Sequence, residues 1–304
     1  MNETFLAVIN PAAGAGRCGK QAPGAIEELR RAGIPIEPAE SSAPGDAIRL
    51  ARDAYRAGYR KFLAVGGDGT SYEIVNGLFP EAEVGGPSEE RPTLALLPLG
   101  TGNSFLRDFT DRGEQYARQC LLAGRTRPCD VLRLRHRDGV LYFMNLLSVG
   151  FTADVATLTN RRFKPLGEFG YLLGVLVCLI RLHRRAFPHR VDREPELDRR
   201  PCLFLTFNNS QFTGGKMRIA PQANSGDGLI EYVRWGPIGR MGLIANLHRL
   251  YDGSHVNHPL ASRRAVQRIE FDLDGPVDIM VDGEVQRVEC QLLEILPAAL
   301  QVMA

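Results

Sequence analysis

Three short glycine-rich segments carry the residues whose types and spacing could bind a phosphate. Residues 66–70 read Gly-Gly-Asp-Gly-Thr and residues 99–103 read Leu-Gly-Thr-Gly-Asn, each directly after an apolar run. Glycines let backbone N–H groups approach a phosphate, and the N-terminus of a following helix adds a favourable dipole. The polar residues of each segment could also serve only as helix caps, so either segment alone leaves both interpretations open.

The third segment, residues 10–17, follows the first apolar run of the chain and contains Asn10, Gly14 and Gly16. It lacks the Gly-Lys-Ser/Thr of a Walker loop and the full dinucleotide-binding fingerprint, so a plain tight turn explains it equally well. Three such turns at the ends of successive apolar runs are hard to explain as coincidence. Together they predict a site for a polyphosphate.

The first 127 residues predict an α/β domain. The apolar runs at 5–9, 61–65 and 93–97 are expected strands, and 19–32, 44–58 and 71–79, with a start near Asn103, are expected helices. Strand, glycine turn and helix in succession are typical of a doubly wound sheet, in which ligands bind at the carboxyl ends of the strands.

Residues 128–304 predict a β-rich second domain with a helical insertion. Strands are expected at 130–136, 140–149, 202–208, 228–233, 268–273, 277–281 and 290–296, and helices at 166–185 and 238–251. The stretch 181–200 contains seven arginines, four acidic residues and two prolines. It is expected to be a loop, either merely solvated or attractive to anionic headgroups.

Composition narrows the class of protein. The chain has 304 residues, 44% hydrophobic and 24% charged, with a net charge of +2, so bulk charge gives no support for nucleic-acid binding. Its six cysteines form no Cys-x-x-Cys pair and are expected to be buried free thiols in a reducing compartment. The N-terminus does not resemble a signal peptide, which predicts a cytoplasmic protein with visits to a membrane surface.

The three turns, in this order, resemble the catalytic domain of the diacylglycerol kinase and sphingosine kinase superfamily in its single-chain bacterial form. Residues 220–229 resemble the family's Ala-Pro…Asp-Gly-Leu loop, and residues 282–284 resemble its Asp-Gly-Glu turn. The resemblance implies an N-terminal fold shared with NAD kinases and 6-phosphofructokinases and a β-rich, sandwich-like second domain. It also implies ATP and Mg²⁺ in the cleft between the domains.

The resemblance places the nucleotide-binding residues in the three turns and at Ser41, which stands where the family has a threonine. They are Asn10, Gly14, Gly16, Ser41, Gly66, Gly67, Asp68, Gly69, Thr70, Thr101 and Asn103.

A magnesium loop is also implied by the resemblance, made of Asp227 and the main-chain oxygens of Asn224 and Leu229. Hard cations prefer carboxylate and carbonyl oxygens, and phosphoryl transfer needs a cation on the phosphate oxygens. These two requirements agree in part with the implied magnesium loop. Ser-Gly-Asp-Gly is also ordinary turn sequence, so a simple turn stays open.

Two carboxylates compete for the role of general base, because a lipid hydroxyl must lose its proton during phosphoryl transfer. Glu284 resembles the base of bacterial lipid kinases, whereas in sphingosine kinases the proposed base is the carboxylate equivalent to Asp68. We expect Glu284 to be the base and Asp68 to position the nucleotide. An Asp-Gly hairpin turn would account for Asp282 and Gly283 but not for Glu284.

Residues 148–155 begin a segment, continuing to 171, that resembles the lipid segment of sphingosine and ceramide kinases. There Phe151 and Asp154 would contact the lipid, with Asp154 at the polar end of a long-chain base. Many bacterial members have closely related spacing. The apolar helix expected from 166 onward could cover an acyl chain, dock on lipid or lie in the core.

The sequence thus predicts an ATP-dependent kinase of phospholipid metabolism, with Mg²⁺ as cofactor and diacylglycerol or a related lipid as acceptor. The alternatives are a sphingosine- or ceramide-type kinase, a NAD kinase-like enzyme and a non-catalytic nucleotide or lipid sensor. The expected partners are ATP, the lipid and, transiently, a membrane surface. The sequence leaves open whether the protein forms a homodimer.

Overall fold

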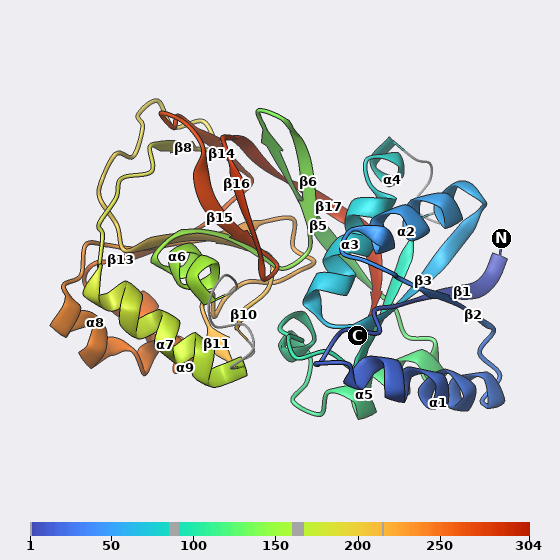
Figure 1. Ribbon diagram of the computed structural model, residues 1–304. Coiled ribbons are helices and arrows are strands. Elements are labelled where there is room, and N and C mark those ends of the chain that lie inside the picture. Colours follow the sequence, from blue (N-terminus) through green and yellow to red (C-terminus); the bar gives the residue numbers. More distant parts are fainter. Residues whose placement is uncertain (1, 85–90, 160–166, 215) are drawn as a thin grey trace.

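The computed structural model describes residues 2–84, 91–159, 167–214 and 216–304, and side chains are described for residues 3–83, 91–159, 174–214 and 216–304. These residues form two lobes joined by one continuous sheet (Figure 1). Part of the predicted lipid segment, 160–166, and the side chains of residues 167–173 lie outside the described residues.

The first lobe contains a parallel sheet and its helices. In chain order these are β1 (Asn2–Ile9), α1 (Arg17–Arg31), β2 (Ile36–Glu40), α2 (Asp46–Arg56), β3 (Tyr59–Gly66), α3 (Asp68–Leu78), α4 (Glu81–Val84), β4 (Thr93–Pro98), the 3₁₀ helix η2 (Phe105–Asp108) and α5 (Glu114–Ala123).

The strand order β2-β1-β3-β4 is parallel throughout, with α1 on one face and α2 and α3 on the other (Figure 1). This confirms the predicted doubly wound domain. Strand β2 was missed because Pro38 interrupts its apolar pattern, and proline is tolerated there since β2 is the edge strand. The helix expected near Asn103 is only the short η2, and the α-helix begins later, at Glu114.

The second lobe contains the remaining strands and helices. They are β5 (Arg127–His136), β6 (Gly139–Phe143), β7 (Leu146–Gly150), α6 (Phe151–Leu158), α7 (Gly167–Ile180), β8 (His189–Val191), β9 (Phe204–Asn208), β10 (Phe212–Thr213), β11 (Met217–Arg218), β12 (Ile230–Trp235), α8 (Arg240–Asn246), α9 (Arg249–Asp252), the 3₁₀ helix η5 (Ser254–Asn257), β13 (Ala261–Val266), β14 (Arg268–Phe271), β15 (Val277–Val281), β16 (Glu284–Val288) and β17 (Cys290–Met303).

An antiparallel sheet of order β13-β12-β9-β7-β15-β16 packs on β5, β14 and β17 of the larger sheet. Apolar side chains of both sheets fill the space between them, which confirms the β-rich, sandwich-like second half. Helices α6 to α9 cover the other face of the smaller sheet, around the buried side chains of Phe204 and Trp235. Two sequence expectations were wrong in detail: the strand expected at 140–149 is broken after Phe143 into β6 and β7, and the helix at 238–251 is two short helices.

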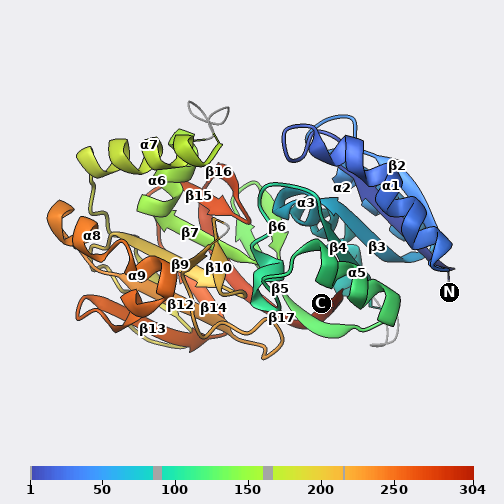
Figure 2. The same ribbon diagram turned by 90° about the horizontal axis from the view of Figure 1, so that it is seen from below.

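Strand β17 ties the lobes together. It pairs with β14 and β5 in the second lobe, and its last residues, 301–303, run parallel to β4 in the first. Both chain ends therefore lie in one lobe (Figure 2). The division into domains 1–127 and 128–304 stays a prediction, and β17 takes part in the sheets of both.

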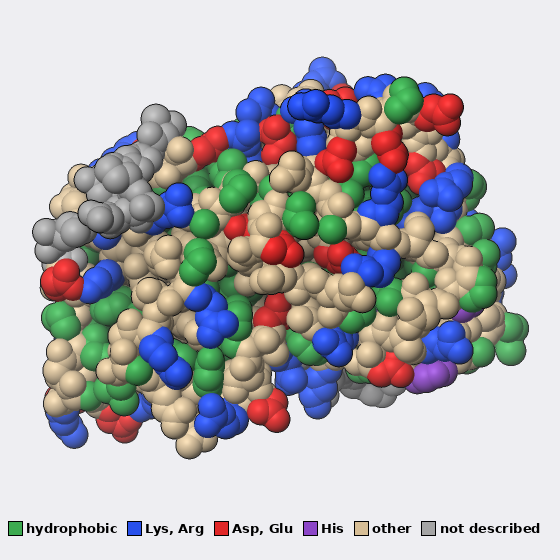
Figure 3. Space-filling model, turned by 180° about the vertical axis from the view of Figure 1, so that it is seen from behind, with side chains coloured by type: hydrophobic (Ala, Val, Ile, Leu, Met, Phe, Trp, Pro, Cys, Tyr) green, Lys and Arg blue, Asp and Glu red, His purple; other side chains and the backbone are tan. Residues whose placement is uncertain are grey.

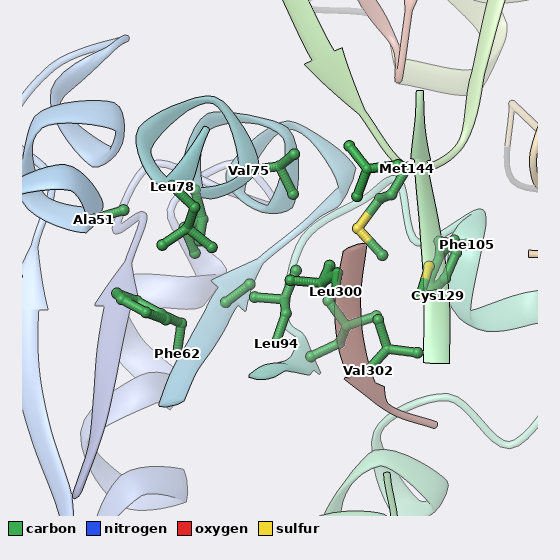
Figure 4. Close-up of a cluster of buried hydrophobic side chains, with 14 of the residues drawn as sticks. Ala51, Phe62, Val75, Leu78, Leu94, Phe105, Cys129, Met144, Leu300 and Val302 are labelled. Atoms are coloured by element: carbon green, nitrogen blue, oxygen red, sulfur yellow. The ribbon is translucent and has the colours of Figure 1, made fainter. Parts of the chain in front are cut away.

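The core beneath α2 and α3 also spans both halves of the sequence. Phe62 and Leu94 of the parallel strands meet Leu78 of α3, and Leu300 and Val302 of β17 continue the same cluster (Figure 4). The C-terminal strand thus completes the core of the N-terminal lobe.

Helix α3 is fastened to the second lobe by two side chains. The Asn76 amide donates to the carbonyl oxygen of Tyr142 (2.7 Å) and its oxygen accepts from the Tyr142 N–H (3.0 Å). One turn earlier, the Tyr72 hydroxyl accepts from Nε2 of Gln286 in β16 (2.7 Å). The helix that follows the Gly66–Thr70 turn is therefore fixed relative to the strands that carry Glu284.

None of the described helices combines the length and the apolar character needed to cross a membrane. All six cysteines are free thiols, and all but the half-buried Cys178 are buried, as expected.

A third link between the lobes is the carboxylate of Asp108, at the end of η2. Its oxygens accept from the backbone N–H of Gln211 at 3.0 and 3.1 Å. Burial raises the pKa of Asp108 to about 7, although these hydrogen bonds favour the charged form.

We therefore expect Asp108 to make the free energy of unfolding dependent on pH. The folded state keeps a proton that the unfolded chain, with a pKa near 3.8, releases as pH rises from about 4 to about 7. The stability that Asp108 contributes should fall across that window. In urea titrations, the stability of wild type relative to Asp108→Asn should therefore decline between these pH values. The exposed Asp111→Asn variant serves as the control, and parallel curves for wild type and Asp108→Asn would contradict the prediction.

Candidate active site

The carboxyl ends of the four parallel strands bring the predicted nucleotide residues together. Asn10 follows β1 and donates its backbone N–H to Val65 of β3 (3.0 Å). Ser41 follows β2, and both its N–H and its hydroxyl donate to the carbonyl oxygen of Ile9 (2.8 and 3.2 Å). Because β2 and β3 flank β1 on opposite sides, these strand ends form the point of the sheet where ligands generally bind.

The second and third glycine turns pack directly on each other. A Cβ atom on Gly67 would lie 2.6 Å from the carbonyl oxygen of Gly102, and one on Gly100 would lie 2.6 Å from the backbone of Gly67. The N–H of Gly100 donates to Gly66 (2.7 Å), and that of Asp68 donates to Gly102 (2.8 Å). Contact between the turns is therefore one reason for their glycines.

The first turn joins this cluster from the other side. A Cβ atom on Gly14 would lie 2.9 Å from the carbonyl oxygen of Leu99, and the Arg17 guanidinium donates to the carbonyl oxygen of Gly100 (3.1 Å). Gly14 and Gly16 both adopt positive φ values, of 62° and 83°. The structure thus brings all three predicted turns into one surface, and it adds Arg17, which the sequence analysis did not single out.

Asp68 bridges the second turn to the third. Its two carboxylate oxygens accept from the backbone N–H of Ser104 at 3.0 and 2.8 Å. Burial raises the pKa of Asp68, while its hydrogen bonds to Ser104 favour the charged form. The carboxylate therefore caps the start of η2 rather than only the helix in which it lies. Ser104 escaped the sequence analysis because its backbone N–H takes part in the contact, and a backbone group leaves no sign in the sequence.

The other polar residues of the turns differ in their environments. The Asn103 amide donates to Gly100 within its own turn (3.1 Å), and the Thr101 side chain is exposed. The Thr70 hydroxyl is buried against Gly66 and has no hydrogen-bond partner among the described residues. Their predicted contacts with a nucleotide remain predictions.

The hairpin between β15 and β16 is anchored by the buried carboxylate of Asp282. Three consecutive backbone N–H groups, of Met144, Asn145 and Leu146, donate to it at 3.2, 3.1 and 2.9 Å. Burial raises the pKa of Asp282 to about 7, and the nearby charge of Asp68 adds to the increase. The sequence analysis assigned Asp282 only to the turn, because nothing in the sequence shows that a strand breaks opposite it.

Glu284 lies two residues after Asp282, and its side chain approaches the second glycine turn from the other lobe. Its carboxylate oxygen lies 3.0 Å from where a Cβ atom on Gly69 would be. The Glu284 side chain is exposed and forms no hydrogen bond or ion pair with another described residue. The structure therefore places the two candidate bases, Asp68 and Glu284, beside the same turn.

The predicted magnesium loop lies elsewhere, against the buried Asp130 of β5. Asp130 accepts from the N–H groups of Gly228 (2.7 Å) and Ala298 (2.6 Å), and its own N–H donates to Ser225. Burial raises the pKa of Asp130, and the negative charge of Asp227 raises it further. Two carboxylates and a loop of carbonyl oxygens form a donor set that fits a hard cation. Across the described ranges, no hydrogen bond or ion pair links this loop to the glycine turns.

The predicted lipid residues lie on α6. Phe151 is buried, and its N–H donates to Leu203 (2.9 Å). Both carboxylate oxygens of Asp154 accept from the Arg185 guanidinium at 2.6 Å. Asp154 is thus already paired with a cation supplied by the chain itself.

Both halves of the chain match known protein families. Residues 4–134 match the family described as diacylglycerol kinase catalytic domain, and residues 145–304 match the YegS C-terminal NAD kinase beta sandwich-like domain. A relative from Mycobacterium tuberculosis called diacylglycerol kinase is 27% identical over 98% of this chain and 94% of its own. A probable lipid kinase YegS-like from Chromohalobacter salexigens is 33% identical over 92% of this chain and 87% of its own.

A crystal structure of a putative diacylglycerol kinase from Bacillus anthracis shares the fold. It superposes with a TM-score of 0.77 over 99% of this chain and 95% of its own, at 20% sequence identity. The matches to both halves and the full-length relatives show that the chain belongs to the family of diacylglycerol kinases and YegS-like lipid kinases.

Proposed function

We propose that this protein transfers the γ-phosphoryl group of ATP to the hydroxyl of a neutral lipid such as diacylglycerol. The observation that carries the proposal is the position of the Glu284 carboxylate, which reaches Gly69 from the opposite lobe. A polyphosphate lying along the three turns would end beside it. The names of the relatives, diacylglycerol kinase and probable lipid kinase, support the same reaction.

The nucleotide is bound in this proposal by the surface that the three turns form together. Helix α3 begins at Asp68, so its N-terminus points at the strand ends and favours phosphate oxygens. Asp68 holds the second and third turns at a fixed separation through Ser104. It thereby positions the phosphate-binding backbone before the nucleotide arrives, which avoids the cost of ordering it during binding.

Glu284 accepts the proton of the lipid hydroxyl in the proposed reaction. Its carboxylate is exposed and free of hydrogen bonds to described residues, so its lone pairs are available to an incoming hydroxyl. Asp68 is less suited to this step, because both of its oxygens already accept from Ser104. Asp282 keeps Glu284 in place by anchoring the turn between them.

The acceptor is inferred to be neutral because of the pair between Asp154 and Arg185. A long-chain base carries an amino group, and its recognition would need an acidic side chain whose charge is not already neutralised. Both carboxylate oxygens of Asp154 already accept from the Arg185 guanidinium. Diacylglycerol, which has no amino group, requires no such partner.

Mg²⁺ would be held in the second lobe by the carboxylate of Asp227 and the carbonyl oxygens of Asn224 and Leu229. When bound, the ion would supply positive charge that offsets the two neighbouring carboxylates, Asp130 and Asp227. The Leu229 N–H donates to one oxygen of Asp227 (3.0 Å), which leaves the other oxygen for a ligand.

The substrate class is tested by incubating the purified protein with labelled ATP, Mg²⁺ and detergent-dispersed lipids. Diacylglycerol should be labelled, and sphingosine, which carries an amino group, should be labelled at least about 100-fold more slowly, which corresponds to roughly 3 kcal/mol of discrimination. Ceramide, whose nitrogen is a neutral amide, is included for comparison. Monoacylglycerol and NAD complete the panel. Label in NAD alone would overturn the proposed lipid reaction, whereas sphingosine as the preferred acceptor would overturn only the inference drawn from Asp154.

Replacing the proposed base should slow the chemical step. Glu284→Gln keeps the size and polarity of the side chain but cannot take a proton, so kcat should fall about 100- to 1000-fold. The affinity for ATP, measured by calorimetry, should stay close to that of wild type. The control is Glu289→Gln, which removes a carboxylate just beyond the far end of β16. Wild-type kcat in Glu284→Gln would show that this carboxylate is not the base.

Asp68→Asn should lower turnover by about 100-fold through misplacement of the nucleotide, with little change in the thermal unfolding midpoint. The asparagine oxygen can still accept from Ser104, so the cap should survive in part. Because Asp68 is proposed to position the phosphates, the KM for ATP should also rise. If kcat alone falls in this variant while Glu284→Gln stays active, Asp68 is the base and the assignment is reversed.

A further inference from the structure

A patch of exposed apolar side chains lies where α7 ends and α8 begins, away from the glycine turns. The side chains of Ile180 and Met241 are 71% and 76% exposed, more than any other large hydrophobic side chain of the described residues. Leu176 precedes Ile180 by one helical turn on α7, and Ile244 follows Met241 by one turn on α8, and both are also exposed. The spacing places each pair on one face of its helix.

The two helices are held together at this patch. The Arg240 guanidinium donates to the carbonyl oxygens of Leu179 (3.1 Å) and Ile180 (2.8 Å), the last residues of α7. A Cβ atom on Gly239 would lie 3.4 Å from the Arg184 guanidinium. An open pocket of about 660 Å³ lies between these segments, lined by His183, Arg184 and residues 239–242. The apolar residues of both helices therefore belong to one surface.

The two stretches that form this surface contain arginines but no acidic residue. The described stretches 174–185 and 236–251 contain five arginines, namely Arg181, Arg184, Arg185, Arg240 and Arg249, and no acidic residue. Asp154 pairs with Arg185, and Asp252 lies beside Arg249, which leaves three arginines uncompensated. Within the described ranges, Arg181, Arg184 and Arg240 form no ion pair.

Several arginines elsewhere on the molecule are paired with acidic residues. Arg133 pairs with Glu83 and Glu294, and Arg268 pairs with Glu270 and Glu294. Figure 3 shows acidic and basic side chains intermixed along the upper part of the molecule. In the α7–α8 patch, by contrast, arginines without an ion pair among the described residues stand beside four exposed apolar side chains.

We propose that the α7–α8 patch (Leu176, Ile180, Arg181, Arg184, Met241 and Ile244) docks the protein on the surface of an anionic bilayer. The apolar side chains enter the boundary between headgroups and acyl chains, and the arginines contact anionic headgroups. A neutral protein partner would leave the charges of Arg181 and Arg184 unmatched, whereas an anionic lipid surface matches both these charges and the apolar side chains. Helix α6 packs against α7 and against β15 and β16, so docking connects through one helix to the hairpin of Glu284 (Figure 2).

The test is vesicle sedimentation of the full chain, without ATP or a lipid acceptor. Wild type should bind phosphatidylcholine vesicles that contain phosphatidylglycerol and bind pure phosphatidylcholine much more weakly. Arg181→Gln with Arg184→Gln should weaken binding to the anionic vesicles about 30-fold, because each arginine near such a surface contributes about fivefold. Ile180→Ser with Met241→Ser should weaken it about tenfold or more.

Matched controls come from the first lobe. Leu122, 56% exposed on α5, and Arg31, exposed at the end of α1, give the variants Leu122→Ser and Arg31→Gln, which should bind as wild type does. Wild-type binding by both patch variants would overturn the proposal. So would a dimer in analytical ultracentrifugation that dissociates on Met241→Ser, because the patch would then be a contact between two copies. Since the assay needs no turnover, vesicle binding without kinase activity would refute the proposed function and leave the docking surface intact.

Discussion

The buried carboxylate of Asp282 is the contact on which the position of the second lobe's hairpin depends. In a regular strand, successive N–H groups point in opposite directions, so three consecutive ones can reach a single carboxylate only where the strand is broken. The break between β6 and β7 supplies Met144, Asn145 and Leu146 for this purpose. Burial raises the pKa of Asp282 to about 7, although these hydrogen bonds favour the charged form. The buried carboxylate therefore lies in the turn that directly precedes Glu284.

The glycine turns of the first lobe obey a second constraint, which is that they must fit against each other. Gly67 and Gly100 leave no room for a side chain on either, because each would meet the backbone of the opposite turn. Asp68 then fixes the separation of the two turns by accepting from Ser104. The phosphate-binding pattern seen in the sequence is thus also a packing pattern. A substitution at Gly67 would disturb the shape of the site even if the ligand never touched that residue.

Local pattern was enough to predict the doubly wound lobe, the β-rich half and the three turns, because each depends on residues close in the sequence. The errors occur where distant contacts override local pattern. Pro38 hid an edge strand, and the apolar run at 140–149 gave no sign that Asp282 would require a break in it. The approach of Glu284 to Gly69 could be expected only from resemblance. It arises from β17 crossing between lobes and from Asn76 and Tyr72 fastening α3 to the second lobe.

The two carboxylates beside Gly69, those of Asp68 and Glu284, differ in the hydrogen bonds that each would lose on accepting a proton. Asp68 would have to release Ser104 to take a proton, and the third turn would lose its cap at the moment when phosphate has to be held. Glu284 has no hydrogen bond to another described residue that it would have to break. A separate residue, Asp282, anchors the turn that precedes it. Glu284 also belongs to the lobe that carries α6, where the acceptor is expected, while the nucleotide is expected on the other lobe. A base carried on the acceptor's lobe keeps its position relative to the acceptor, so hydroxyl and base can meet the phosphate together.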